Sequence, residues 1–201
     1  MTVSAHDVAA YILQRQGGMS AMKLQKLVYY SQAWHLVWDE KPLFNEPIQA
    51  WANGPVVYEL FDTHRGQFSV SGKWPVGDPD ALSASERQTI DIVCDHYGKL
   101  TGQALSALTH SEAPWREARG ALPATARSSA VITQAALADF YSALSQDDDA
   151  DVVDDLDWQE YEAEIAREYE AEMVAEYETQ MVAEYERDAY PDYGPDESDY
   201  L

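Results

Sequence analysis

The sequence is poor in the groups that build disulfides, metal sites and membrane spans. Its 201 residues include one cysteine, Cys94, which excludes an internal disulfide and a thiolate zinc site. Cys94 lies in an apolar stretch and is predicted to be a buried structural thiol. No run of about 18 apolar residues occurs, and no basic segment followed by an apolar run opens the chain. We therefore expect a cytoplasmic protein that does not span a membrane.

Patterns typical of catalysis are also scarce. The chain has no Gly-rich phosphate loop, and none of its five histidines lies four residues from another. His35 lies in an aromatic segment, which favours a core role. His110 lies just before an expected helix start, where a helix N-terminus can hold an anion, but no nucleophile or orienting carboxylate accompanies it. We favour a structural turn role for His110, assign no catalytic residue, cofactor or metal ligand, and expect that the protein is not an enzyme.

Charge divides the chain into two parts. Residues 146–201 contain 22 of the 36 acidic residues but only 2 of the 13 basic residues, a net charge of -20. Residues 1–145 are close to neutral and contain five of the six tryptophans. A segment of that length buries enough surface for one stable core. We predict a domain over residues 1–145 and an acidic linker and tail over residues 146–201.

Residue patterns in the front part predict a compact, mainly α domain. Ser4 and Asp7 have capping-box spacing for a first helix that ends at Gly17. Ser20 is expected to cap a second helix over residues 21–38, which is apolar on nearly every face and should therefore be central. Its exposed end is expected at Lys23, Gln25 and Lys26. Further helices are predicted over residues 56–64, 83–97, 102–108, 109–115 and 133–144.

A small two-stranded β element is predicted beside these helices. Residues 48–52 and residues 68–71 alternate between apolar and polar, so we expect two short strands that pair with each other. Asn53, Gly54 and Pro55 form a sharp corner between them. Gly54 adopts positive φ at little cost, and Pro55 is expected to start the next helix because its missing N–H is not needed there.

The tail contains an internal repeat of eight residues. Its composition favours a helix from residue 157 to residue 188, followed by a disordered end. Eight residues rotate a helix by about 80° beyond two full turns, so the repeated tyrosines spiral instead of forming one seam. The candidate contact residues of the tail are Tyr161, Tyr169, Tyr177 and Tyr185.

Four segments of the front part, in order, resemble the Panacea domain family. They are residues 22–34 (MKLQKLVYYSQAW), residues 42–51 with PLF and IQAW, residues 53–57 (NGPVV) and residues 108–115 (LTHSEAPW). The resemblance covers roughly residues 3 to 120. The family includes SocA-like antitoxins and the phage-associated protein GepA. It supplies no established catalytic residues to transfer.

The resemblance implies a mainly helical domain and an antitoxin that neutralises a protein toxin, encoded by an adjacent gene, through direct binding. SocA is described as a proteolytic adaptor for a ClpXP-type protease, so delivery of the toxin to such a protease is a second hypothesis. The acidic tail lies outside the family pattern. It suggests a third hypothesis, a phage decoy that imitates the charge of DNA. We expect no direct binding of nucleic acid, because phosphate contacts need a basic face.

Aromatic anchors at a protein interface are the features that such a binding role requires. The candidate partner-binding residues form two segments that contribute only if they meet in space. The alternative is that these residues simply close the core. The candidates are Trp51, Asn53, Gly54, Pro55, Thr109, His110 and Trp115.

Overall fold

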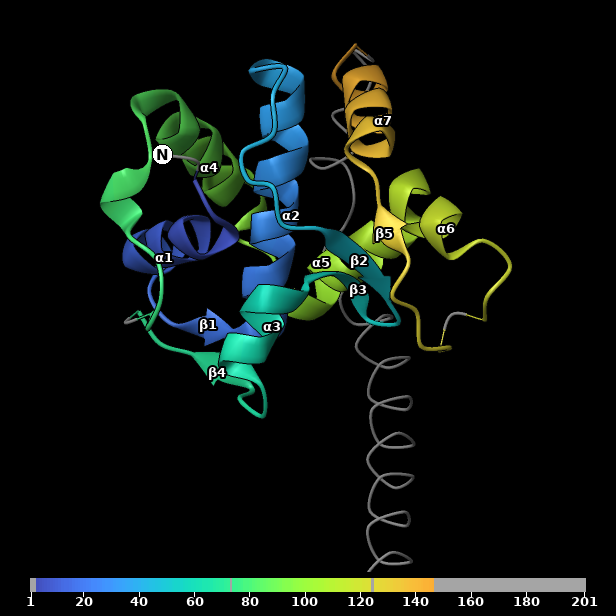
Figure 1. Cartoon of the computed structure of the whole chain (residues 1–201), viewed down its shortest axis with the longest axis horizontal. Coiled ribbons are helices and arrows are strands. Elements are labelled where there is room, and N and C mark those ends of the chain that lie inside the picture. The colour runs from blue at the N-terminus through green and yellow to red at the C-terminus, as the bar shows by residue number, and fades with distance from the viewer. Residues whose placement is uncertain (1–2, 73, 124, 147–201) are drawn as a thin grey trace, which may run out of the picture.

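Seven α-helices form most of the described part of the chain, which confirms the mainly α prediction (Figure 1). The computed structural model describes residues 3–72, 74–123 and 125–146. The helices are α1 (Ala5–Gln16), α2 (Ala21–Trp38), α3 (Tyr58–His64), α4 (Ala84–Tyr97), α5 (Gly102–Ser111), α6 (Ala113–Arg119) and α7 (Gln134–Gln146), with a 3-10 turn η1 (Pro79–Ala81). The strands are β1 (Met19–Ser20), β2 (Ile48–Trp51), β3 (Gly54–Val57), β4 (Ser69–Val70) and β5 (Val131–Ile132).

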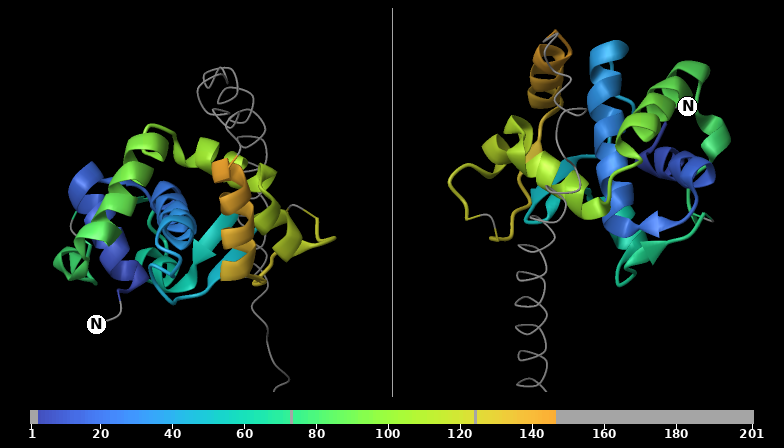
Figure 2. Two further views of the ribbon diagram at one scale, coloured as in Figure 1. Left: turned by 90° about the horizontal axis from the view of Figure 1, so that it is seen from above. Right: turned by 180° about the vertical axis from the view of Figure 1, so that it is seen from behind.

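Helix α2 is the central helix of the domain. It lies between α4 and α7, with α1 and α5 against its lower half (Figures 1 and 2). Apolar residues are buried on all its sides, as the sequence predicted, and Ser20 accepts a hydrogen bond from the Lys23 backbone N–H at its start. The prediction of an exposed end was wrong for Gln25 and Lys26, which are 3% and 1% exposed.

The buried polar side chains of α2 bind the backbone of the segment that passes beside it. Gln25 donates to the Val57 carbonyl and accepts from the Val57 N–H, at 3.2 and 2.9 Å. Gln32 does the same for the turn at Phe44, donating to its carbonyl at 3.0 Å and accepting from its N–H at 3.1 Å. Buried backbone groups must find partners, and amide side chains offer both a donor and an acceptor. These residues are therefore buried because they hold residues 43–57.

The predicted caps and the buried thiol are confirmed. Ser4 and Asp7 form a capping box at the start of α1, and Ser83 and Glu86 form another at the start of α4. Burial raises the pKa of the Cys94 thiol to about 11, which keeps it protonated and unreactive at neutral pH.

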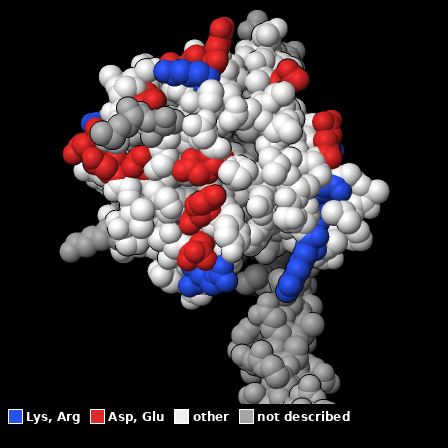
Figure 3. Space-filling view, in the orientation of Figure 1, with Lys and Arg blue, Asp and Glu red and all other residues white. Residues whose placement is uncertain are grey.

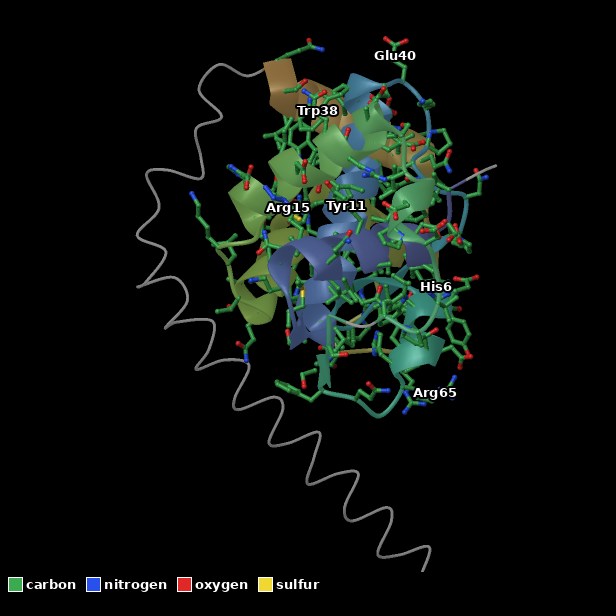
Figure 4. The ribbon with its side chains drawn as sticks, turned by 90° about the vertical axis from the view of Figure 1, so that its left-hand side faces the viewer. His6, Tyr11, Arg15, Trp38, Glu40 and Arg65 are labelled. Atoms are coloured by element: carbon green, nitrogen blue, oxygen red, sulfur yellow. The ribbon has the colours of Figure 1, made fainter. Side chains whose placement is uncertain are left out.

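The outer face of α1 is joined to α4 by a charged contact. Arg15 of α1 bridges two carboxylates of α4, with N–O distances of 2.9 Å to Asp91 and 2.6 Å to Asp95. Figure 4 shows Arg15 on this face, beside Tyr11. The Tyr11 hydroxyl also donates to Asp91, at 3.1 Å.

The predicted strand pairing and the predicted helix start at Pro55 were wrong. Strand β2 pairs with β3 in an antiparallel hairpin and with β5 on its other side, whereas β4 pairs with β1. Gly54 adopts a φ of +94°, which allows the chain to reverse over the two residues Ala52 and Asn53. Residues 54–57 therefore pair with β2 instead of forming a helix. The helix therefore starts at Tyr58.

Two further points concern membrane-spanning helices and the acidic tail. Among the described residues, no helix combines the length and apolar character needed to cross a membrane. The octad repeats and the candidate tail contacts Tyr161, Tyr169, Tyr177 and Tyr185 lie outside the described residues, so the predicted tail helix and the boundary at residue 145 stay predictions.

Candidate functional site

The two predicted segments meet in space and form one continuous structure. The Trp115 indole N–H donates to the Trp51 carbonyl at 2.9 Å, and the Ser106 hydroxyl donates to the Asn53 carbonyl at 2.9 Å. The His110 ring stacks on the Trp115 ring with centroids 4.0 Å apart. We call this structure the hairpin corner; it consists of Trp51, Asn53, Gly54, Pro55, Thr109, His110 and Trp115.

Gly54 allows the hairpin to lie directly on helices α2 and α5. A Cβ atom at this position would lie 2.6 Å from Lys26 Cε, 2.8 Å from Lys26 Nζ and 2.9 Å from Thr109 Oγ1. Its φ of +94° is also a conformation that side chains with a Cβ rarely adopt. The corner therefore requires glycine for two independent reasons, the backbone angle and the close approach.

Lys26 lies directly beneath Gly54 and was missed as a site residue. Its ammonium donates to the Pro55 carbonyl at 3.1 Å, and it forms no ion pair within the described ranges. Burial lowers the pKa of Lys26 to about 7. The signal in the sequence was a lysine inside a helix that is apolar on all other sides.

His110 lies just before α6, which begins at Ala113 as the sequence predicted, but it also forms part of the last turn of α5. Burial, followed by the positive charges of Lys26 and Arg119, lowers the pKa of His110 to about 4 despite a hydrogen bond with the Ala52 backbone. The imidazole is therefore neutral at physiological pH. A neutral ring at the carbonyl end of α5 contributes no positive charge that would attract an anion.

Arg119 stabilises the inner side of the hairpin corner through hydrogen bonds to backbone carbonyls. Its guanidinium donates to the carbonyls of Ala50, Pro123 and Ala126 at 2.9, 2.7 and 2.7 Å. It also lies over the Trp115 ring, 4.9 Å from the centroid. One buried side chain thus ties β2, α6 and the loop that leads to β5 into a rigid unit.

Only part of the hairpin corner is available to a partner. Asn53 is exposed, and Trp51 and His110 are half-buried. The other four candidates, Gly54, Pro55, Thr109 and Trp115, are buried and support these three from below. Their observed role is to close the core.

The exposed part of the corner continues onto α3 as an aromatic surface. The Trp51 and Phe61 rings lie 4.7 Å apart, and Tyr58, which is 41% exposed, lies 6.1 Å from Phe61. Arg65 donates to the Tyr58 hydroxyl and lies over the Phe61 ring. The surface over β2 and β3 is largely uncharged, whereas carboxylates gather on the left of the same face (Figure 3). An aromatic surface on a rigid base, with a charged residue at its edge, is typical of a protein-binding site.

A second buried group, Glu112, lies between α5 and α6 and was also missed. Its carboxyl accepts from the hydroxyls of Tyr141, Tyr30 and Tyr29 at 2.7, 3.1 and 3.5 Å. Burial raises the pKa of Glu112 to about 7, although the three hydroxyls act in the opposite direction. We call these four residues the Glu112 cluster. The sequence offered only weak signals, a glutamate between two short helices and two adjacent tyrosines on α2.

The described residues offer little to a metal ion. No group of three His, Cys, Asp or Glu side chains in these ranges is arranged to hold one. The hairpin corner presents aromatic rings, an amide and a neutral imidazole, which are groups suited to contact with another protein.

Comparison with known proteins gives one match. Residues 24–116 match the family model described as "Antitoxin SocA-like, Panacea domain", which confirms over these residues the resemblance seen in the motifs. The matched range contains the whole hairpin corner and Glu112, but not α1 or α7. No curated protein matches the chain, and neither does any solved structure.

Proposed function

We propose that this chain, which contains a SocA-like Panacea domain, is an antitoxin that neutralises a toxin by binding it through the hairpin corner. The observation that supports the proposal most is the position of Trp51, Asn53 and His110. They are the accessible residues of a corner that lies entirely inside the matched domain. Antitoxins of this family imply a protein partner, and we propose that the toxin is encoded by an adjacent gene.

The rigidity of the corner favours tight binding. Lys26, Ser106, Arg119 and Trp115 each donate a hydrogen bond to the backbone of residues 50–55. A surface held in this way loses little conformational entropy when a partner docks. Trp51, Phe61 and Tyr58 then provide large aromatic contacts, the residue type that dominates binding energy at many interfaces.

Co-expression with the product of the adjacent gene tests the proposal. We expect that product to be toxic alone and harmless beside this chain. Trp51→Ala and Tyr58→Ala should weaken complex formation at least about ten-fold, whereas Ile92→Ala, an exposed apolar residue on α4, should not. Circular dichroism checks that each variant is folded. A harmless gene product would count against the antitoxin role, and full activity of both aromatic variants would count against the corner.

A second candidate function is that of an adaptor that delivers the toxin to a ClpXP-type protease. The family resemblance supports it, and the acidic residues after Ser145 would serve as the handle. Removing residues 146–201 and measuring turnover of the toxin tests this role. Unchanged turnover would reject a part for the tail.

The net charge of -20 over residues 146–201 favours a third candidate, a phage decoy that imitates DNA. Binding of that kind weakens steeply as salt is added, because it depends on unscreened charge. Measuring the affinity for the partner at low and high salt separates it from the corner proposal. Binding that does not respond to salt would argue against a decoy.

We further propose that the chain acts in the cytoplasm without catalysing a reaction. The neutral His110, stacked on Trp115, supports this view, because the neighbouring Thr109 hydroxyl donates to the Ser106 carbonyl and not to the imidazole. Turnover of a small metabolite by purified protein, lost on His110→Ala, would contradict it.

A further inference from the structure

Helix α7 covers the Glu112 cluster, although α7 lies outside the matched domain. Tyr29, Tyr30 and Glu112 all lie within residues 24–116, whereas α7 spans Gln134–Gln146. The matched domain therefore presents a carboxyl group surrounded by aromatic rings, and a separate segment of the chain supplies its cover. Figure 1 shows α7 alongside the upper half of α2.

Helix α7 packs along α2 and also contacts α6. Only Leu137 and Tyr141 are fully buried, at 1% and 0% exposure, while Phe140 and Leu144 are partly buried. The Tyr141 ring makes edge contacts with Tyr29, Tyr30 and Trp34, with centroids 6.3, 6.2 and 5.3 Å away. An element anchored by two buried side chains opens locally at a lower free energy than the core unfolds.

Tyr29, Tyr30, Trp34 and Glu112 form the floor beneath α7. Their chemistry determines which side chains can cover them. Glu112 is 7% exposed, so its carboxyl needs hydrogen-bond donors, and the shortest bond comes from the Tyr141 hydroxyl of α7. An acidic side chain at that point would meet the carboxyl and be disfavoured. Leu137, Tyr141 and Leu144 follow helical spacing along one face. The floor is therefore complementary to an amphipathic helix with a hydroxyl donor at the centre of its apolar face.

The aromatic floor also extends beyond α7 to the surface. Trp34 stacks on Trp38 with centroids 5.1 Å apart, and Trp38 is 43% exposed. Figure 4 shows Trp38 at the end of the domain opposite Arg65. An incoming helix can therefore contact Trp38 before α7 has left.

We propose that the groove formed by Tyr29, Tyr30, Trp34 and Glu112 receives an amphipathic helix of the toxin, and that α7 is the placeholder which this helix displaces. The incoming helix places apolar residues where Leu137 and Leu144 lie and a hydroxyl donor over Glu112. This inference rests on the proposed function for the existence of a toxin, but it assigns a second surface, distinct from the hairpin corner.

Hydrogen exchange on the intact wild-type chain tests whether α7 opens by itself. We expect the amides of α7 to exchange through a local opening, at a free energy clearly below that of the central amides of α2. Exchange of both helices at the same free energy would mean that α7 opens only when the whole domain unfolds. That result would overturn the proposal.

A labelled peptide with the sequence of residues 133–146 tests whether the groove accepts a helix from outside. The Leu137→Ala chain, with its own α7 weakened, should bind this peptide at least about ten-fold more tightly than the wild-type chain does. The matched control is Ile92→Ala, whose exposed side chain lies on α4. A peptide carrying Phe in place of the central Tyr should bind several-fold more weakly, because Glu112 then loses its shortest hydrogen bond.

Two outcomes of the peptide experiment would contradict the proposal. Equal binding to the Leu137→Ala and Ile92→Ala chains would show that the groove does not receive the peptide. Dimerisation of Leu137→Ala that protects α7 and is blocked by the peptide would identify a second copy of this chain as the occupant. Neither measurement contains the toxin, so failure here leaves the co-expression result intact, and a harmless neighbouring gene product would leave the groove result intact.

Discussion

The hairpin corner and the Glu112 cluster each bury an ionisable group, but they hold it in different ways. Lys26 and Glu112 are 1% and 7% exposed, and burial moves the pKa of each to about 7 from opposite directions. Neither forms an ion pair with the other within the described part of the chain. Lys26 donates to a backbone carbonyl, whereas Glu112 accepts from three side-chain hydroxyls.

This difference separates a fixed region from an exchangeable one. The Pro55 carbonyl belongs to a strand paired with β2, so the hydrogen bond of Lys26 breaks only if the hairpin moves. One of the hydroxyls on Glu112 comes from α7, and another side chain of the same chemistry can replace it. The hydrogen bond of Lys26 therefore depends on the hairpin, whereas one of the three hydrogen bonds to Glu112 depends on α7.

The largest effect is expected from removing the carboxyl of the exchangeable region. Glu112→Ala leaves three tyrosine hydroxyls without their acceptor and opens a cavity, so it should lower the free energy of unfolding by about 3–5 kcal/mol. Glu112→Gln keeps an acceptor for Tyr141 and should cost only about 1 kcal/mol. Urea unfolding measures both. Equal losses would mean that neither the volume of the side chain nor the acceptor kept by glutamine contributes to stability.

The two buried groups should also give opposite pH dependences. Glu112 has a pKa of about 7 in the folded chain against an ordinary value of 4.5, so the folded state holds the proton longer and stability falls as pH rises from 4.5 to 7. Lys26 has a pKa of about 7 against 10.5, so the unfolded state holds the proton longer and stability rises with pH above 7. The change amounts to about 3 kcal/mol at most for Glu112 and about 5 kcal/mol at most for Lys26.

Stability differences between each variant and wild type isolate the contributions of Glu112 and Lys26. They are needed because His110 changes stability with pH in the direction opposite to Glu112 at acidic pH. Its pKa falls from 6.5 to about 4, so its contribution to stability rises with pH over that range. We expect the stability of wild type relative to Glu112→Gln to fall between pH 4.5 and pH 7. The stability of Lys26→Met relative to wild type should fall above pH 7. Urea midpoints at each pH provide the measurement, and parallel profiles for the three proteins would refute the assignment.

A smaller effect is expected at the fixed region from Gly54→Ala. The added Cβ would lie within 2.9 Å of Lys26 and Thr109 and would require a φ of +94°, so we expect a loss of about 2–3 kcal/mol. Gly66→Ala is the matched control, because Gly66 also has positive φ but no atom within 4 Å of the added Cβ. It should cost about 1 kcal/mol, the backbone part alone. Similar thermal unfolding of both variants would show that the close approach is unimportant.

The smallest effects should rank the three tyrosines by their distance from Glu112. Tyr141→Phe should cost about 1–1.5 kcal/mol, Tyr30→Phe somewhat less and Tyr29→Phe about 0.5 kcal/mol, following distances of 2.7, 3.1 and 3.5 Å. Each change removes one hydroxyl and leaves the ring in place. Chemical denaturation of the three variants provides the order, and a reversed order would contradict the assigned geometry.

Local patterns predicted the helices well and the sheets poorly. The capping boxes at Ser4 and Ser83 fix helix starts through neighbouring residues alone, so the sequence predicts them directly. Strand pairing depends on which segments meet, and the alternation in residues 48–52 does not identify a partner. The two segments of the hairpin corner could be singled out because their aromatic and turn residues stand out locally, and the structure brings them together. Lys26, Arg119 and Glu112 were missed because only tertiary contacts bury them.

By itself the sequence determined a helical domain built around α2, with charge concentrated after residue 145 and motifs of a SocA-like Panacea domain. Such features follow from periodicity, capping and composition, which act over a few residues. Tertiary structure alone decided that Lys26 lies under Gly54, that His110 is neutral, and that Tyr141 covers Glu112. These outcomes depend on burial and on hydrogen bonds between residues as far apart as Tyr29 and Tyr141, and no local pattern encodes that proximity.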